Sequence, residues 1–217
     1  MKLWKRVDCI VVEKKFIEDG IIKLRISQYL EKELSKAGFS RVEIQKTPLI
    51  TRITVYVTNP GRVIGRGGEK INSITEVIRN RFKIDNPEIS VAEVQNEKLE
   101  PRLVARFIAN SLERGVNPRA LLHSAIRDIM LNGALGAEIV ASGKLAAKGA
   151  RAKTIKVRLG YLPKAGDITK FVDEAKVAAY PKYGAIGVTV RIVQPGTIFP
   201  KQRITKVELP KNIAIGE

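Results

Sequence analysis

One glycine-rich stretch, residues 61–71, constrains the fold of this chain more than any other. It reads GRVIGRGGEKI. The alternating apolar run Ile53–Val57 precedes it and predicts a half-buried strand. Apolar residues then recur at helical spacing over Ile71–Phe82, which predicts a helix. The glycines therefore lie where a strand passes through a short helical turn into a longer helix.

Three phosphate-binding motifs have comparable glycine spacing, and this stretch violates two of them. A nucleotide-binding P-loop that began at Gly61 would need its second glycine where Arg66 stands, and the only lysine of the stretch, Lys70, is followed by Ile71 rather than by serine or threonine. The dinucleotide fingerprint needs its third glycine at Lys70. The third motif, apolar-Ile-Gly-x-x-Gly-x-x-Ile, is the K-homology (KH) loop, which clamps four nucleotides of a backbone. Residues 63–71 fit it at every position, so the stretch resembles a KH loop.

The residue types of this loop suit a phosphate for steric and electrostatic reasons. Glycine lets the main chain approach a sugar–phosphate backbone and adopts turn angles closed to other residues. The helix start behind the loop offers free N–H groups and a positive dipole end. An ordinary glycine turn is the alternative interpretation, but the framing strand, helix and apolar residues favour RNA. The candidate RNA-binding residues of the loop are Arg62, Ile64, Gly65, Arg66, Gly67, Gly68 and Lys70.

The charge balance points to a polyanionic partner. Lysine and arginine number 39 against 22 acidic residues, a net charge of +17. An anionic membrane surface is the competing partner, but no basic amphipathic helix with an aromatic face appears, so nucleic acid is favoured over a membrane. No run of about 18 apolar residues exists, and Asp8 interrupts the apolar opening of the chain. We therefore expect a cytoplasmic protein.

The chain holds one cysteine, Cys9, and one histidine, His123. These counts exclude an internal disulfide and a thiolate metal cluster. Catalysis by carboxylates, lysine or tyrosine stays open, although no pair stands out. A nuclease would gather acidic residues around Mg²⁺, yet acidic residues are scarce where the positive charge is densest. We predict no catalytic residue, no metal, no cofactor and no small-molecule substrate, and hence no enzyme.

The first half of the chain predicts an α+β domain. Its elements follow the order helix, strand, strand, short helix, loop, helix, strand. The expected bounds are 21–37 for the first helix, 41–46 and 50–57 for two strands, 69–82 for the later helix and 89–94 for the last strand. This order resembles a type II KH domain, in which one sheet face packs on three helices. The RNA groove is then expected between the loop, the later helix and the last strand.

The second half predicts two helices followed by a four-stranded sheet. A polar break at 96–101 separates the halves. Helical spacing appears over 104–112 and after Asn117-Pro118, and strands are expected at 138–142, 154–159, 171–179 and 186–192. Between Lys144 and Arg191 there are 11 basic and 3 acidic residues, which favours a phosphate-facing surface over a merely solvated one. The candidate RNA-binding residues here are Lys144, Lys148, Arg151, Lys153, Lys156 and Arg158.

Family-specific runs extend the resemblance along the chain. Residues 133–145 and 183–192, with 14–20, 47–52 and 60–68 upstream, resemble ribosomal protein three of the small subunit, the universal S3 family in its archaeal form. The resemblance covers roughly residues 14–193. It implies an N-terminal extension at 1–13, a type II KH domain at 14–97, a two-helix, four-stranded α/β-sandwich at 98–193 and an extended basic tail at 194–217.

The resemblance also implies a function. The chain would be a structural constituent of the small-subunit head that binds small-subunit ribosomal RNA and neighbouring head proteins. It would help form the region where messenger RNA enters during translation. A free KH-domain regulator or RNA-decay accessory protein is the alternative; it shares the loop but leaves the basic second half unexplained.

The family's bacterial branch holds incoming messenger with basic residues early in the second helix of the C-terminal domain. Those positions correspond to Arg119, Ala120 and His123, of which only Arg119 keeps a full charge at neutral pH. This departure weakens the expected hold on messenger RNA. Arg114 and Arg127 are candidates to compensate, so Arg114, Arg119 and Arg127 complete the set of predicted RNA-binding residues.

Overall fold

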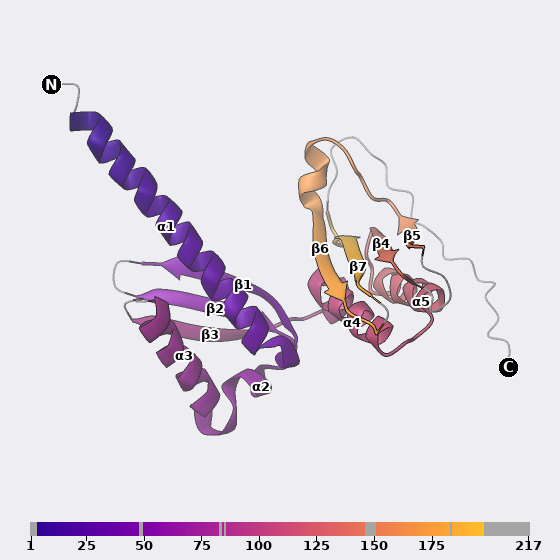
Figure 1. The fold of residues 1–217 in the computed structure, drawn as a ribbon, viewed down its shortest axis with the longest axis horizontal. Coiled ribbons are helices and arrows are strands. Elements are labelled where there is room, and N and C mark those ends of the chain that lie inside the picture. Colours follow the sequence, from indigo (N-terminus) through magenta and orange to yellow (C-terminus); the bar gives the residue numbers. More distant parts are fainter. Residues whose placement is uncertain are drawn as a thin grey trace. The chain divides into compact units, whose positions relative to one another are not determined.

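The computed structural model describes residues 4–47, 50–82, 84, 86–145, 151–182 and 184–197. The chain divides into two compact units, Met1–Gln95 and Asn96–Glu217 (Figure 1). Each unit combines helices with its own sheet, so the predicted α+β class is confirmed. Most of the tail expected at 194–217 lies outside the described residues.

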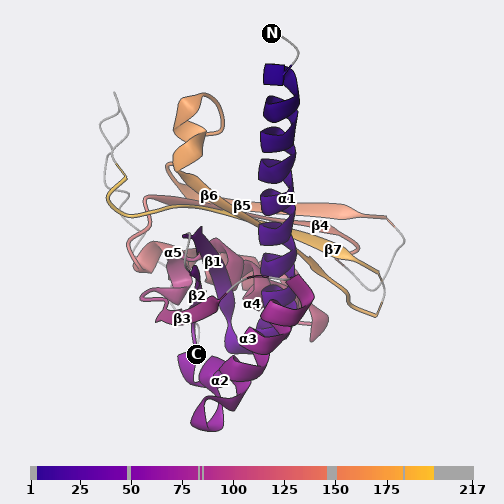
Figure 2. The same ribbon diagram turned by 90° about the vertical axis from the view of Figure 1, so that its left-hand side faces the viewer.

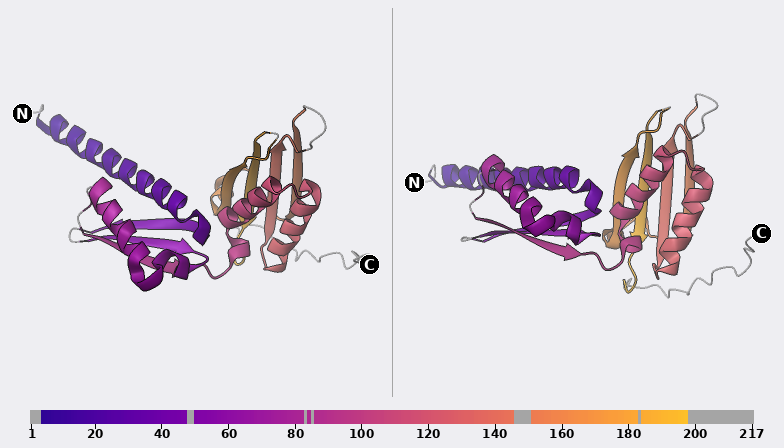
Figure 3. Two further views of the ribbon diagram at one scale, coloured as in Figure 1. Left: turned by 60° about the horizontal axis from the view of Figure 1, so that its bottom comes forward. Right: turned by 90° about the horizontal axis from the view of Figure 1, so that it is seen from below.

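Unit 1 has a three-stranded sheet in the order β1-β2-β3. Its strands are β1 (Phe39–Lys46), β2 (Thr51–Val57) and β3 (Pro87–Glu93). Its helices are α1 (Trp4–Glu33), α2 (Pro60–Ile64) and α3 (Glu69–Phe82), with 3-10 turns at Ser35–Ala37 and Arg66–Gly68. β1 and β2 are antiparallel, and β2 and β3 are parallel. Figure 3 shows α1 and α3 over the same face of this sheet.

The core of unit 1 lies between that sheet face and the three helices. The period-two pattern of β2 places Ile53, Val55 and Val57 on the buried face. Buried residues of all three helices join them, among them Leu30 of α1, Val63 of α2 and Ile78 of α3. The predicted element order and the packing of three helices on one face are therefore confirmed.

The first helix differs from the prediction at its start. We expected it to begin near Ile21, but α1 begins at Trp4 and runs to Glu33. Asp19-Gly20 suggested a break, yet Gly20 does not adopt a positive φ. A helical glycine costs only about 1 kcal/mol relative to alanine, which a helix of 30 residues can offset. Lys46 Nζ lies 2.9 Å from Asp19 Oδ1 and ties this part of α1 to β1.

Unit 2 packs two helices on one face of a four-stranded antiparallel sheet in the order β5-β4-β7-β6 (Figure 2). The helices are α4 (Pro101–Glu113) and α5 (Pro118–Leu131). The strands are β4 (Gly136–Gly143), β5 (Lys153–Gly160), β6 (Val172–Ala179) and β7 (Ile186–Val193). 3-10 turns occupy Glu97–Leu99 and Asp167–Phe171, so the strand expected from residue 171 begins at Val172 instead.

The boundaries of α5 follow from local chemistry. Asn117 Oδ1 accepts a hydrogen bond from the backbone N–H of Arg119 at 3.1 Å, and Pro118 occupies the first helical position. Gly133 follows the helix with a φ of 91°, a conformation that favours glycine. The predicted start of this helix is confirmed.

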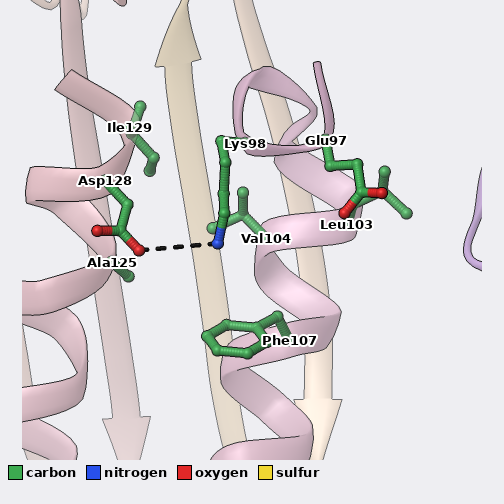
Figure 4. A pocket seen from close by; sticks show the side chains of 8 residues that line it. All are labelled: Glu97, Lys98, Leu103, Val104, Phe107, Ala125, Asp128 and Ile129. Atoms are coloured by element: carbon green, nitrogen blue, oxygen red, sulfur yellow. Dashed lines mark ion pairs between the residues drawn. The ribbon is translucent and has the colours of Figure 1, made fainter. Parts of the chain in front are cut away.

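A shallow groove between α4 and α5 is closed at one end by the turn that precedes α4. Figure 4 shows Lys98 of that turn reaching toward Asp128 of α5. The Lys98 ammonium lies 3.7 Å from the Asp128 carboxylate and 5.3 Å from the centre of the Phe107 ring on α4. These contacts join the turn to both helices.

Candidate nucleic-acid interface

The predicted KH loop joins α2 to α3 through glycines in left-handed conformations. The φ angles of Gly65, Gly67 and Gly68 are 74°, 60° and 82°. A Cβ atom at Gly65 would lie 2.9 Å from the Cβ of Lys70, so a larger residue would collide with the first turn of α3. At Gly67 nothing lies within 4 Å of such an atom, and at Gly68 only an Ile71 methyl group at 3.9 Å. The main chain is therefore open to close approach on this side.

The side chains of the loop divide between core and solvent. Val63 is buried and anchors α2 in the core of unit 1. Ile64 is 42% exposed, which is unusual for isoleucine beside a core and leaves an apolar contact available to a ligand. Arg62 and Arg66 are exposed, and Lys70 is half-buried. The loop thus offers an open main chain, an apolar side chain and cationic groups.

The start of α3 is less positive than the sequence suggested. The backbone N–H of Glu69 donates to the carbonyl of Arg66, so this donor is already used. The Glu69 carboxylate lies in the first turn, where it stabilises the helix but competes with an incoming phosphate. Sequence reasoning gave Glu69 no role. The cationic side chains of the loop, Arg62, Arg66 and Lys70, are therefore better candidates for an anion contact than the helix start itself.

The predicted cations of unit 2 that the structure describes fall into three groups. Arg119 and Arg127 are exposed on α5, with His123 midway between them at helical spacing, and Arg114 is exposed just after α4. These groups belong to the helical side of the sheet. The structure therefore joins Arg119 and Arg127 in one stripe, as helical periodicity predicts.

A second group lies at one end of the β4–β5 pair. Lys144 follows β4, and Arg151 and Lys153 stand where β5 begins. Lys153 pairs with Gly143 in the strand register, which places these cations near one another. Lys148 falls outside the described residues. This end of the hairpin is a candidate phosphate contact.

The open face of the four-stranded sheet carries an ordered row of charges. Register aligns Arg158 of β5, Glu138 of β4, Arg191 of β7 and Glu174 of β6, so the sign alternates across four strands. Cross-strand neighbours of opposite charge attract one another. Lys156 lies one pleat away on the same face of β5. The row links all four strands on the side that the helices leave uncovered.

Glu138 is the centre of this row. Its side chain is fully buried, and its carboxylate lies 2.8 Å from Lys156 Nζ, 2.9 Å from Lys164 Nζ and 3.4 Å from Arg191. Burial opposes ionisation of Glu138, but hydrogen bonds and attraction from Lys156 and Lys164 outweigh it and lower the pKa to about 2. The hydrogen bond to Glu138 in turn raises the pKa of Lys156.

This network changes the interpretation of Lys156. The prediction treated it as a phosphate contact, whereas the structure shows its ammonium already paired with a carboxylate. Sequence reasoning did not single out Lys164 and Arg191, which complete the network. The register of β4 against β7 carries the missing signal, because it sets Arg191 opposite Glu138. Among the described residues the Arg158 guanidinium donates to the Leu162 carbonyl, at 3.4 Å, and to no carboxylate, so its charge is not paired in this network.

The described part of the chain holds no group of three or more histidine, cysteine or acidic side chains suited to a metal ion. Over the same residues, no helix is both long and apolar enough to span a bilayer.

Comparison with known proteins gives two family models that match consecutive parts of the chain. One, described as KH domain, matches residues 25–99 and therefore includes the loop, α3 and β3. The other, described as Ribosomal protein S3, C-terminal domain, matches residues 108–192, from within α4 to the end of the sheet. The KH interpretation of the loop and the ribosomal resemblance of the second half are thus confirmed.

Curated relatives match along most of their own length. The small ribosomal subunit protein uS3 of Methanocaldococcus jannaschii is 41% identical over 90% of this chain and 94% of the relative. Those of Methanobrevibacter smithii and Methanothrix thermoacetophila are 42% and 43% identical over 88% of this chain and 76% and 69% of the relatives. With such identity over nearly its whole length, the chain belongs to the small ribosomal subunit protein uS3 family.

Proposed function

We propose that this chain is a structural constituent of the small ribosomal subunit and binds small-subunit ribosomal RNA. The observation that carries the proposal is the match of a KH domain to residues 25–99, followed by the match of a ribosomal protein S3 C-terminal domain to residues 108–192. The net charge of +17 suits a polyanion. The uS3 family is structural and non-enzymatic, which confirms the expectation that the chain is not an enzyme. We expect it on ribosomes in the cytoplasm.

We further propose how its surfaces are used. The KH loop contacts an RNA backbone through the open main chain at Gly67 and Gly68. The α5 stripe of Arg119 and Arg127 faces messenger RNA where it enters the subunit head, and neighbouring head proteins cover other faces. The proposal is supported by the exposure of these two arginines and by their alignment on one face of the helix. The stripe has few charges, so its contribution to the affinity for messenger RNA is modest.

Sedimentation of native cell lysate through sucrose, at low and high salt, tests the proposal. We expect the chain to travel with small subunits and to stay there in high salt. The same gradients include Gly67→Asp and Gly67→Asn. Both residues tolerate the left-handed conformation of Gly67, so the pair differs in charge rather than in backbone strain. Gly67→Asp should be released at lower salt than Gly67→Asn.

The outcomes separate the possible functions. A wild-type chain found only at the top of the gradient, free or on short RNAs, would overturn the ribosomal function in favour of a regulator. A wild-type chain on subunits, with both Gly67 variants released at the same salt, would leave the function standing and remove the loop as a phosphate contact.

A further inference from the structure

Unit 1 contains a second basic site, a cleft of about 350 Å³ between α1 and α3. It is separate from the KH loop, which lies at the opposite end of α3 from the two α3 residues that line the cleft. Its volume is within the range of pockets that hold small ligands. Six side chains line it: Arg25, Gln28, Tyr29, Lys32, Arg81 and Phe82.

Two aromatic residues, Tyr29 and Phe82, line this cleft. Tyr29 and Phe82 are half-buried and pack against the core of unit 1, with ring centres 6.2 Å apart and planes inclined at 57°. In the described part of the chain the Tyr29 hydroxyl has no hydrogen-bond partner. Burial and the nearby Glu33 carboxylate raise the pKa of Tyr29, partly offset by Arg81, so the hydroxyl stays a donor at neutral pH.

Three cations surround these rings. Arg25 and Lys32 project from α1 at positions seven residues apart, which lie on the same helix face as Tyr29. Arg81 comes from α3, with its guanidinium carbon 5.9 Å from the centre of the Phe82 ring. All three are exposed, and none of the lining residues is acidic. No described residue forms an ion pair with Arg25, Lys32 or Arg81.

Three cations converge on the cleft and none of its lining residues is acidic, so these cations repel one another, and an anion that enters the cleft lowers the free energy of the site. An acidic peptide would satisfy the charges but leave the aromatic rings unused. A nucleotide uses both, because its phosphate pairs with the cations and its base stacks on aromatic rings or on the plane of arginine. The mixture of aromatic and basic side chains therefore favours RNA over an acidic protein segment.

We propose that this cleft binds one nucleotide of single-stranded or looped RNA, with Arg25, Lys32 and Arg81 on the phosphate and Phe82 or Tyr29 against the base. This inference rests on the proposed function and specifies a further RNA contact within it. It would give unit 1 a second contact with RNA in addition to the loop.

Charge-neutralising variants of the full chain test the proposal. Arg25→Gln and Arg81→Gln each remove one cleft cation. Lys23→Gln and Arg79→Gln are matched controls, since they remove one exposed cation from the same two helices outside the cleft. The measurement is affinity for a transcript of small-subunit ribosomal RNA at several salt concentrations. Thermal unfolding confirms that each variant is folded.

Each cleft variant should lower affinity about fivefold to tenfold more than its control. It should also reduce the slope of log affinity against log salt by about 0.7 to 0.9, the effect of one lost phosphate contact. Photo-crosslinking of the wild-type complex through thiouridine should label the peptide that contains Tyr29 or the one that contains Phe82.

Cleft variants that match their controls in affinity and slope, with no crosslink at either ring, would overturn the proposal. Unchanged RNA affinity with loss of incorporation into subunits would overturn it in favour of an acidic protein segment. A wild-type chain that binds no ribosomal RNA and does not sediment with subunits would instead refute the proposed function.

Discussion

At the scale of single residues, Glu138 shows how a buried charge can be kept ionised. Three cations from two strands and a loop surround one carboxylate, so the network has more positive than negative charge. A carboxylate buried without such partners would take up a proton instead. The partners themselves are each about one-third to one-half exposed, and water therefore weakens the attraction.

Because of Glu138, the stability of unit 2 depends on pH in the acidic range. Because its folded-state pKa is about 2 against an ordinary 4.5, its contribution is complete above pH 4.5 and is lost as the pH falls toward 2. Glu138→Gln should lower the free energy of unfolding by about 2 kcal/mol at pH 7, and its stability should change less between pH 4.5 and 2. Urea unfolding at a series of pH values measures both effects.

The control for this experiment is Asp167→Asn, which removes the carboxylate of a largely exposed ion pair with Lys170. Exposed pairs contribute little, so this change should leave stability within about 0.5 kcal/mol of wild type at every pH. Equal pH profiles for Glu138→Gln and wild type would show that Glu138 is not the group responsible.

At the scale of elements, helix α5 presents the charges assigned to messenger RNA. Arg119→Glu should weaken retention of messenger by reconstituted small subunits about threefold, the size expected for one exposed charge. The effect should appear with a messenger that fills the region where it enters the head. It should be absent with a shorter messenger that ends before that region.

Lys182→Glu is the matched control for α5, because it reverses an exposed charge in the same unit but outside the helix. If both reversals weaken retention equally with both messengers, the effect comes from net charge alone, and α5 is not a messenger contact.

The sequence predicted elements well where local signals agree. Helix α3 has the expected bounds, since glycines precede it and its apolar residues follow one period. The start of α1 was wrong, because a glycine that predicts a break also fits a helix when its φ is negative. The predicted bounds of the unit 2 strands agree with the structure to within about two residues. Alternation of apolar and polar residues determines which face of the sheet a side chain lies on, but not where the strand ends.

The candidate site was less predictable than the fold. The glycine pattern identified the loop, and family models confirm its KH domain. Sequence could not show that Lys156 pairs with Glu138, nor that Arg25 of α1 shares a cleft with Arg81 of α3. Both facts depend on strand register or helix packing, which bring together residues far apart in the chain. Charge counts reveal that a basic surface exists, but not which cations are already paired.

At the scale of the whole molecule, the main hydrophobic core of unit 1 and that of unit 2 have no residue in common among the residues that the structure describes. We therefore predict two unfolding transitions rather than one. Ile78→Ala should destabilise unit 1, and Ile126→Ala unit 2, each by about 3 kcal/mol and without moving the other transition. Calorimetry of the full chain makes the test. A single transition that both variants shift would show that the units unfold together.

The charged row across the open sheet face affects how the stability of unit 2 changes with temperature. Hydration of charged groups becomes less favourable as temperature rises, so the cost of withdrawing the Glu138 carboxylate from water shrinks on warming. The attraction from its three cations does not shrink in the same way. At high temperature the stabilisation from buried apolar side chains increases little further. The charged residues of this face therefore contribute a growing fraction of the stability of unit 2 as the temperature rises.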